Sequence, residues 1–430
     1  MSTEKIVDAS PTKEFFIYMI TRDIQTNAAI VELVDNAIDG AKRLRKDGNY
    51  EGLKIEVTFD KDRFIIKDNC GGIEIETATK YAFKFGRPTE RENQQGYYTG
   101  IFGIGMKRAL FKLGRKFKII STTSTEHFVV DIDVDDWIKK EEWQFDMYDI
   151  QENQEYPEEQ WGTEIVIEEL NSEQKYNFMS KVFENQLHSY IEKYRSVETE
   201  KGLQIILNSQ VINFFKEQLI ETDEIRTYKN YIEDETGKIR IVAGISHYGD
   251  PEKAGWYIMC NGRMVVFADK SSLTGWGSEY RSYHPVMAPF RGYVFFESKD
   301  LLSLPWNTTK TGVDVTNRLY MIAKEKMKEA VEQIGRVISE KKSQYDIDNL
   351  DELPCMKSAK TVCLDHNYIV SISSNSDFEI TEKSPLEEVT TVSFKELKVK
   401  VEAAKKHAKV SNKTDLGKKI FNYYWDMEEL

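Results

Sequence analysis

The sequence lacks the long apolar runs and paired cysteines that mark membrane-spanning or disulfide-stapled proteins. No stretch approaches the roughly 18 to 20 apolar residues that a membrane-spanning helix needs. Residues 1–10 carry no apolar core of the signal-peptide kind. The four cysteines form no CxxC pair, so we expect buried free thiols rather than a zinc site or a disulfide framework: Cys70, Cys260, Cys355 and Cys363. These absences predict a cytoplasmic protein without a membrane partner.

Two common nucleotide-binding signatures are missing as well. The P-loop pattern, GxxxxGK followed by Ser or Thr, does not occur. Gly103-Ile-Gly105 is followed by Met106-Lys107-Arg108, so the dinucleotide-binding pattern GxGxxG is incomplete. A P-loop or a Rossmann site is therefore not supported.

The composition is that of a folded, acidic protein. The chain has 430 residues, of which 40% are hydrophobic and 12% aromatic, and this length predicts two or three domains. Lys and Arg total 59 against 72 Asp and Glu, a formal net charge of -13. This balance disfavours a surface that is basic throughout, but it leaves room for a local nucleic-acid site.

The hydrophobic pattern predicts two successive regions of mixed helix and strand. In the first region we expect helices at 11–20, 28–41 and 105–113, and strands at 53–59, 64–66, 117–121, 127–134 and 163–167. The strongly acidic stretch between the last two strands, 135–159, is interpreted as a solvated excursion. After a helical connector from about 171, we expect strands at 203–207, 239–245, 256–260, 264–267 and 293–296, a long helix at 316–342 and a further helix at 394–409.

The second predicted helix carries an unusual concentration of acids. Glu32, Asp35, Asn36 and Asp39 are spaced by three and four residues, on the face opposite the apolar stripe. Carboxylates held this close repel one another unless a cation or a proton relieves them. The alternative is a solvated helix face, although Asp and Asn are poor formers of a helix interior.

Three further segments carry weaker signals. Residues 67–73 place an acid at a strand end before two glycines, which suits either a turn or a planar ligand. Residues 100–108 combine glycines with Lys107 and Arg108 at a helix start, which suits either a phosphate cradle or a flexible hinge. Residues 161–165 bring a Gly-Thr pair into a strand, which is uninformative by itself.

Taken in this order, the four segments resemble the GHKL ATPases, whose nucleotide site is the Bergerat fold. The family includes the DNA gyrase B subunit, MutL, the ninety-kilodalton heat-shock chaperones, histidine kinases and MORC proteins. The resemblance covers residues 10–170; 28–39 and the Phe85-Gly86 segment look most like MORC proteins, and the 100–107 loop also looks like the chaperones. It implies ATP and Mg²⁺ as cofactors.

The resemblance also implies roles for single residues. Glu32 would be the general base that activates the attacking water, and Asn36 the Mg²⁺ ligand. Asp68 would accept the adenine amino group, and Gly72 and Thr163 would complete the adenine pocket. These roles are chemically sufficient, because phosphoryl transfer depends mainly on positioning and charge neutralisation.

The loop before the third helix would be the lid over the phosphates. Gly100, Gly103 and Gly105 would supply backbone amides, and Lys107 would add charge. One departure from the family pattern lies elsewhere in the site, where Cys70 stands at a position commonly held by glycine.

The second region resembles the transducer domain of MutL and MORC proteins. Residues 256–265 resemble its strand, Asn-Gly-Arg turn and strand, although an ordinary hairpin would look the same. Residues 304–314 resemble the loop whose lysine reaches the γ-phosphate of ATP, which implicates Lys310 in catalysis. Thr308 stands where gyrase-like and MutL-like loops carry glutamine.

The resemblance therefore implies an α+β fold in three parts. Residues 1–170 would form a Bergerat-fold α/β sandwich with an N-terminal dimerisation segment, and 171–342 a transducer α/β domain (ribosomal protein S5-like). Residues 343–430 would form a small charged C-terminal region for a partner protein or DNA. The lid, Lys310 and the N-terminal segment together suggest an ATP-gated homodimer.

Three biological roles compete. The first is a MORC-like or MutL-like clamp on DNA, in bacterial genome maintenance or antiviral defence, with residues 395–419 as the contact because nine lysines there face three acids. A lysine-rich helix that is simply solvated is the alternative for that segment. The second role is a chaperone-like ATPase that remodels a protein client. A histidine kinase is disfavoured, because the first histidine is His127 and no His-bearing helical segment precedes Glu32.

Overall fold

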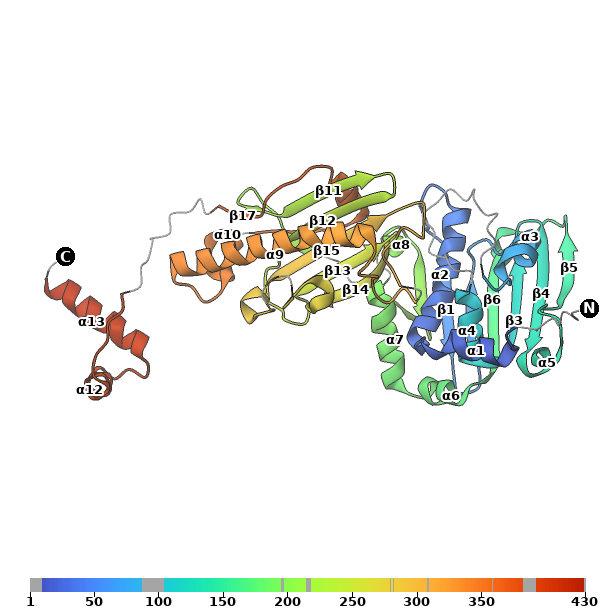
Figure 1. Ribbon diagram of the computed structural model, residues 1–430, viewed down its shortest axis with the longest axis horizontal. Coiled ribbons are helices and arrows are strands. Elements are labelled where there is room, and N and C mark those ends of the chain that lie inside the picture. Colours follow the sequence, from blue (N-terminus) through green and yellow to red (C-terminus); the bar gives the residue numbers. More distant parts are fainter. Residues whose placement is uncertain are drawn as a thin grey trace, which may run out of the picture. The chain divides into compact units, whose positions relative to one another are not determined.

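The computed structural model describes residues 10–86, 104–194, 197–213, 218–278, 280, 282–307, 309–357, 359–381 and 392–428. Contacts divide the chain into two units. The first comprises residues 1–339 and 350–384, and the second comprises residues 340–349 and 385–430. The first unit contains two sheets, which are coloured blue to cyan and green to orange in Figure 1.

The first large sheet has eight strands in the order β5-β4-β3-β6-β2-β1-β7-β8. Its strands are β1 (Lys54–Phe59), β2 (Phe64–Asp68), β3 (Gly114–Thr122), β4 (Glu126–Asp133), β5 (Met147–Glu152), β6 (Gly162–Leu170), β7 (Gln204–Leu207) and β8 (Gln210–Val211). All neighbours are antiparallel except β1 and β7, which are parallel. Strand β6 therefore places the Gly-Thr pair beside the end of β2.

Helices cover one face of this sheet (Figure 1). They are α1 (Lys13–Arg22), α2 (Thr26–Leu44) and α4 (Gly105–Leu113), with α6 (Ser172–Phe178) and α7 (Lys181–Tyr194) following β6. Helix α1 begins after Thr12, whose hydroxyl accepts a hydrogen bond from the N–H of Phe15 at 3.3 Å. Pro11 thus lies outside the helix, two residues before its first residue.

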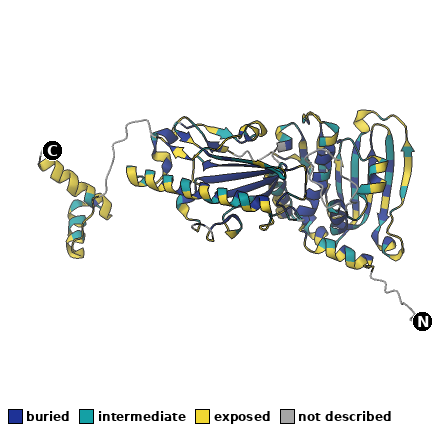
Figure 2. Cartoon of the chain, turned by 45° about the horizontal axis from the view of Figure 1, so that its top comes forward, coloured by how far each residue is buried: buried dark blue, intermediate teal, exposed yellow. Residues whose placement is uncertain are grey.

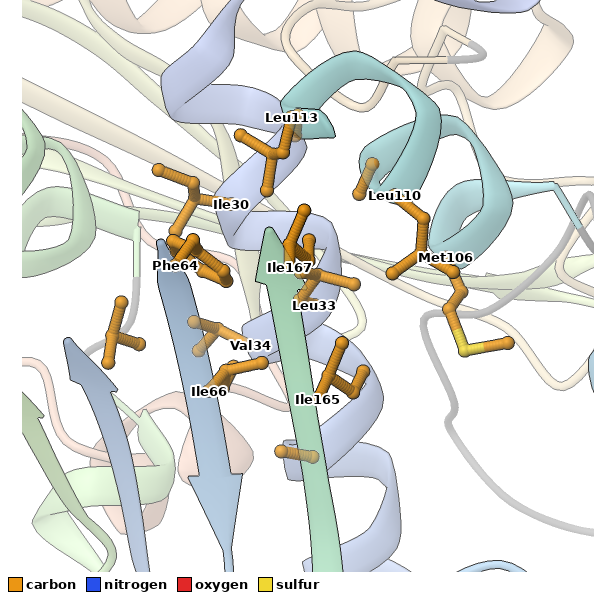
Figure 3. Packing of buried hydrophobic residues seen from close by; sticks show 14 of the residues in the cluster. Ile30, Leu33, Val34, Phe64, Ile66, Met106, Leu110, Leu113, Ile165 and Ile167 are labelled. Carbon is orange, nitrogen blue, oxygen red and sulfur yellow. The ribbon is translucent and has the colours of Figure 1, made fainter. Parts of the chain in front are cut away.

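The first core lies between α2, α4 and the strands β2 and β6 (Figure 3). Ile30, Leu33 and Val34 point from α2 toward the sheet, because residues three and four apart share a helix face. Ile66 and Ile165 meet them from neighbouring strands. Each such side chain contributes roughly 1.5 to 3 kcal/mol on burial, so this seam holds α2 firmly in place.

The second large sheet has the order β11-β12-β15-β13-β14. Its strands are β11 (Tyr228–Asp234), β12 (Gly237–Ile245), β13 (Gly255–Cys260), β14 (Arg263–Asp269) and β15 (Phe290–Glu297). Figure 2 shows its central strands in dark blue, in agreement with nearly continuous burial along β12, β13 and β15. A sheet with continuous apolar strands must be covered on both faces.

Both faces of the second sheet are covered. Helix α9 (Arg318–Tyr345) buries one stripe that repeats every three or four residues, including Leu319, Ala323, Met327 and Ile334. On another face, Leu364, Ile369 and Ile372 join a cluster with residues of the sheet such as Tyr257 and Tyr293. The element α11 (His366–Ser371) belongs to this cover.

The chain beyond residue 343, grouped from the sequence into one C-terminal region, therefore has two parts. Strands β16 (Thr361–Cys363) and β17 (Glu379–Ile380) pair with β9 (Gln218–Ile220) and β10 (Ile225–Arg226) of the first unit. Residues 350–384 accordingly belong to the first unit, whereas 385–430 belong to the second. The second sheet needs this segment, because its apolar strands would otherwise face water.

Several elements were not expected from the sequence. The acidic stretch 135–159 contains α5 (Val134–Lys139) and strand β5, with Trp137 only 3% exposed, so it is not wholly a solvated excursion. Strand β11 was also missed, as was α13 (Lys413–Met427). The expected helix at 394–409 is α12 (Lys398–Ala408), which together with α13 is largely exposed (yellow in Figure 2).

Short helices complete the chain: α3 (Ile75–Thr77), α8 (Val197–Glu200) and α10 (Pro354–Lys357). In the part of the chain that the structure describes, we find no helix long and apolar enough to cross a membrane. Cys70, Cys260 and Cys355 are buried, and Cys363 is half-buried.

Candidate functional site

A cavity of about 530 Å³ opens beside α2, within the range that holds small-molecule ligands. Its lining comes from α2, the end of β2 with the segment that follows it as far as Ala82, α4, the loop between β3 and β4, the start of β6 and one loop of the second sheet's region. Eight of the ten residues predicted from the sequence line it: Glu32, Asn36, Asp68, Gly72, Gly105, Lys107, Thr163 and Lys310. The other two, Gly100 and Gly103, lie outside the described residues.

The polar face of α2 is buried, not solvated. Glu32 is 4% exposed, Asp35 1% and Asp39 5%. Charged carboxylates are almost never buried unless they are paired, so partners had to come from elsewhere in the chain. This burial contradicts the alternative interpretation of a solvated helix face.

Two cations from the second sheet's region supply the pairing. The Nζ atom of Lys310 lies 3.1 Å from Oε2 of Glu32 and 3.7 Å from Oδ2 of Asp35. Arg263 Nη1 donates to Oδ2 of Asp35 and lies 3.5 Å from Oε1 of Glu32. Lys310 and Arg263 are 3% and 0% exposed. The four side chains therefore form a buried cluster with two charges of each sign.

Lys310 reaches α2 from a loop whose two ends are held together. Its base is closed by an isolated bridge between Trp306 and Val313 and by a hydrogen bond from the N–H of Asn307 to the carbonyl of Gly312, at 3.0 Å. The side-chain oxygen of Asn307 also accepts from the N–H of Thr311. Lys310 has a positive φ of 53°, uncommon for a residue with a side chain and a form of backbone strain that clusters at functional sites. The neighbouring Thr308 lies outside the described residues.

Asp68 closes the other end of the cavity. Its Oδ1 atom accepts hydrogen bonds from the N–H of Cys70 at 2.8 Å and from the N–H of Thr163 at 3.3 Å. Removal from bulk water raises the pKa of Asp68 to about 6, and these two hydrogen bonds oppose the rise. A buried carboxylate favours ligands that donate a hydrogen bond to it over ligands that do not.

The glycines near Asp68 allow neighbouring backbone segments to come close together. A side chain at Gly72, which has φ of 71°, would collide with the backbone of Thr122 at the end of β3. One at Gly162 would collide with the carbonyl of Asp68. Both glycines thus let β2, β3 and β6 come together at the cavity floor. The sequence left a turn and close approach to a planar ligand open as reasons for Gly72, and the structure adds close approach between strands for both glycines.

Cys70 lies close to Asp68 and packs against α2. It is 2% exposed, and a side chain added at Gly40 of α2 would come within 2.9 Å of the Cys70 carbonyl. Burial raises the pKa of the Cys70 thiol above its ordinary value, so the group stays protonated and inert. Cys70 therefore acts as a small apolar residue between α2 and the loop after β2.

Lys107 is buried on the first turn of α4. Its Nζ atom donates to the carbonyl of Ala82 at 2.7 Å, and the residue is only 2% exposed. Burial without a compensating charge lowers the pKa of Lys107 to about 7. An anionic ligand next to this amine would stabilise its protonated form.

Asn36 is the residue in the cavity best suited to a metal that also contacts a ligand. Its side chain lines the cavity, where its amide oxygen could bind the metal; its Nδ2 atom, which is buried without a hydrogen-bond partner among the described residues, could donate to an oxygen of the ligand. No group of three or more acidic, histidine or cysteine side chains able to hold a metal occurs in the described ranges. Mg²⁺ needs none, because it commonly takes one or two protein ligands together with phosphate oxygens and water. The residues present fit that mode.

Two members of the charge cluster were missed from the sequence as site residues. Asp35 was noted among the acids of α2 but given no role, and Arg263 was noted only within the Asn-Gly-Arg turn. The Asn-Gly pair does predict the hairpin of β13 and β14, which the pairing of Cys260 with Arg263 confirms. Nothing in the sequence indicates that the next side chain reaches a carboxylate 228 positions earlier.

Comparison with known proteins agrees with the position of the cavity. Residues 24–163 match the family described as Histidine kinase-, DNA gyrase B-, and HSP90-like ATPase, which is the GHKL type. The match supports the GHKL family for this segment, and with it ATP binding and hydrolysis. The mixed α+β layout with a large sheet is consistent with such a fold. No curated protein matches the chain.

Proposed function

We propose that this protein is a Mg²⁺-dependent ATPase whose catalytic site combines the α2 cavity with Lys310. In this proposal Glu32 activates water, Asn36 holds Mg²⁺, and Asp68 accepts the adenine amino group. Gly72 and Thr163 line the adenine end. Mg²⁺ would neutralise charge on the phosphates.

The phosphate end would be formed by residues at the start of α4. Gly105 and Lys107 line the cavity there, and the amides of a helix start favour bound anions. Gly100 and Gly103 belong to the same proposed lid.

The contact between Lys310 and Glu32 is the observation that carries the proposal. A lysine from the region of the second sheet enters the cavity formed by the first, 278 positions from the carboxylate that it meets. A cation at that place can pass from the carboxylate to a terminal phosphate. Binding of ATP would then change the contacts between the two regions, which is what a nucleotide-gated device requires.

The direct test is ATP turnover by the wild type and by Glu32→Ala. A positioned general base contributes roughly 10² to 10⁴-fold to the rate. The variant should therefore lose a factor of at least about 10² in kcat while it still binds ATP. Glu329→Ala is a suitable control, because Glu329 is an acid on α9 that is absent from the cavity lining. Turnover that survives Glu32→Ala would remove the assignment of the base.

We further propose that the ATPase works as an ATP-gated homodimeric clamp of the MORC or MutL type acting on DNA. The N-terminal segment would join two copies, and antiviral defence or genome maintenance would be the setting. The second unit offers the basic surface: of the nine lysines at 395–419, eight are exposed and Lys405 is half-buried. Sizing with a non-hydrolysable ATP analogue should give a dimer, and an unchanged monomer with bound nucleotide would exclude the clamp.

A chaperone-like ATPase is the second candidate. Exposed apolar side chains on α13 favour it, since a protein client would cover them: Ile420, Phe421, Tyr424, Trp425 and Met427. Two measurements separate the two candidates. Stimulation by duplex DNA favours the clamp, and suppression of aggregation of a model client favours the chaperone.

A further inference from the structure

The cluster of Glu32, Asp35, Arg263 and Lys310 distributes its contacts unevenly. Lys310 is nearer to Glu32, at 3.1 Å, than to Asp35, at 3.7 Å. Arg263 shows the opposite preference, because it donates to Asp35 and lies 3.5 Å from Glu32. Each carboxylate thus has its own main cation.

The hairpin that carries Arg263 is fixed in place. Asn261 and Gly262 both have positive φ, 47° and 81°, as a type I′ turn requires. The Asn261 side chain donates to the carbonyl of Ser298 at 2.9 Å and accepts from its N–H at 3.0 Å. Arg263 follows at once as the first residue of β14. Its guanidinium is therefore held by the sheet, whereas Lys310 lies on a loop.

We propose that Arg263 is a positioning residue for ATP hydrolysis: it pairs with Asp35, so that Lys310 is held mainly by Glu32 and can exchange to the terminal phosphate. This inference rests on the proposed ATPase function. It assigns the two cations different tasks, a fixed counter-charge for Arg263 and a movable one for Lys310.

The charges around the base give the reason. Glu32 faces Asp35 from its own helix, Lys310 and Arg263 from the second sheet's region, and the more distant Arg108 from α4. Without Arg263, Lys310 would stand between two buried carboxylates and be held by both. When it left for a phosphate, two buried carboxylates would remain without a counter-charge, and this would oppose its departure. With Arg263 in place, Asp35 keeps its partner when Lys310 leaves.

Arg263 also makes fewer hydrogen bonds than a structural arginine would. Its Nε and Nη2 atoms are buried without partners among the residues that the structure describes. Such donors are costly, and a buried ion pair is weak evidence for stability. Charge balance at Glu32 and Asp35 explains the residue better than stabilisation of the fold does.

The test compares Arg263→Met, which removes the charge, with Arg263→Lys, which keeps it. We expect Arg263→Met to lower kcat by on the order of 10²-fold with a smaller change in KM. Arg263→Lys should bring kcat back toward the wild-type value, because it keeps a positive charge beside Asp35.

Arg240→Met is the matched control. Arg240 is also buried, at 6% exposed, in the same sheet, and its Nη1 atom lies 2.7 Å from Glu297. It is absent from the cavity lining. Arg240→Met should lower the melting temperature without a comparable loss of kcat. A purely structural Arg263 would behave in the same way.

A double variant guards against a failure to fold. Arg263→Met combined with Asp35→Asn removes one charge of each sign and leaves Lys310 paired with Glu32. We expect the double variant to regain part of the kcat that Arg263→Met loses, because residue 35 then no longer needs a counter-charge. A wild-type kcat in Arg263→Met, or no recovery of kcat in the double variant, overturns the inference. Loss of turnover in Glu32→Ala is independent of both, so the proposed function and this inference fail separately.

Discussion

Gly105, the first residue of α4, packs directly on the carboxylate of Glu32. A side chain added at Gly105 would overlap Oε2 of Glu32, the same oxygen that meets Lys310. The helix that starts the proposed phosphate site therefore leaves room for the proposed base only because its first residue has no Cβ. The glycine is explained by this contact and not by a positive φ, because Gly105 is not among the residues with left-handed backbone.

Gly105→Ala should consequently impair catalysis more than folding. The carboxylate is the far end of a flexible side chain, so it can move aside at little cost in stability, but it then leaves its position. We expect a loss of kcat on the order of 10²-fold with ATP binding retained, as for a misplacement of about 1 Å. Turnover and thermal unfolding measure the two effects. Gly417→Ala, at a helical position with open space around it, should leave turnover unchanged.

Asp68 predicts the pH dependence of nucleotide binding. Its pKa in the folded protein is about 6, so it is mostly ionised at pH 7 and mostly protonated at pH 5. The ionised form is the better acceptor for an adenine amino group, and affinity for ATP should fall by about tenfold over that range. Asp68→Asn corrects for the phosphates, which titrate in the same region. An equal pH dependence in the variant would contradict the assignment.

The same shift predicts a change in stability. The folded pKa of Asp68 is raised above its unfolded value of about 3.9. Its contribution to stability is therefore fully present below pH 4 and is lost as the pH rises through 6. Asp68→Asn should gain stability relative to the wild type above pH 6 and not below pH 4. Chemical unfolding at the two pH values checks the sign.

How much of the site the sequence predicts depends on how far apart its parts lie. The acids of α2 share one helix, so spacing alone placed them together. The loop after β2, the start of α4 and the start of β6 came from a family resemblance, and they do line one cavity. The partner of those acids could not be predicted in the same way, because Arg263 and Lys310 follow hundreds of residues later and no local pattern specifies a buried ion pair.

The fold shows a similar division. Strongly periodic elements such as α2, α9 and β12 were predicted with ends within a few residues. Strand β5 was missed because it lies at the sheet edge within an acidic stretch of sequence, and none of its residues is buried. The segment 361–380 was missed as a cover for the second sheet. Its strands have two or three residues each, too few for a period to appear.

We expect Lys107 to lower the stability of the free protein at pH 7 and to strengthen the binding of ATP. Its folded pKa of about 7 lies below its unfolded value of about 10.4, so the unfolded chain binds more protons between these values. Its contribution to stability therefore rises with pH from about 7 to 10. Lys107→Met should be more stable than the wild type at pH 7, by an amount that shrinks by pH 9, although the Ala82 carbonyl loses a donor.

The same variant should bind ATP more weakly, because a buried amine next to the phosphates would gain a proton and a partner on binding. Unfolding at pH 7 and pH 9, together with ATP titration, separates the two effects. Lys112→Met is the control on the same helix, since Lys112 is ion-paired with Glu173 and does not line the cavity. A less stable Lys107→Met that binds ATP normally would make Lys107 a structural residue.

The lysine-rich segment predicts how DNA binding should respond to salt. Each lysine that neutralises a phosphate adds about 0.9 to the slope of log affinity against log salt concentration. Replacing four exposed lysines with glutamine should lower that slope by up to about 4 and weaken binding for every DNA sequence alike: Lys398, Lys400, Lys406 and Lys409.

The control is the same replacement at four exposed lysines of the first unit, which changes the net charge equally: Lys46, Lys61, Lys84 and Lys299. DNA titrations over a range of salt concentrations measure the slope for both sets. If the two sets lowered the slope equally, binding would follow the net charge of the protein and not this segment. A DNA contact made by the second unit requires that only the first set lower it. ATP turnover without DNA should stay at the wild-type rate in both, because none of the eight lysines lines the nucleotide cavity.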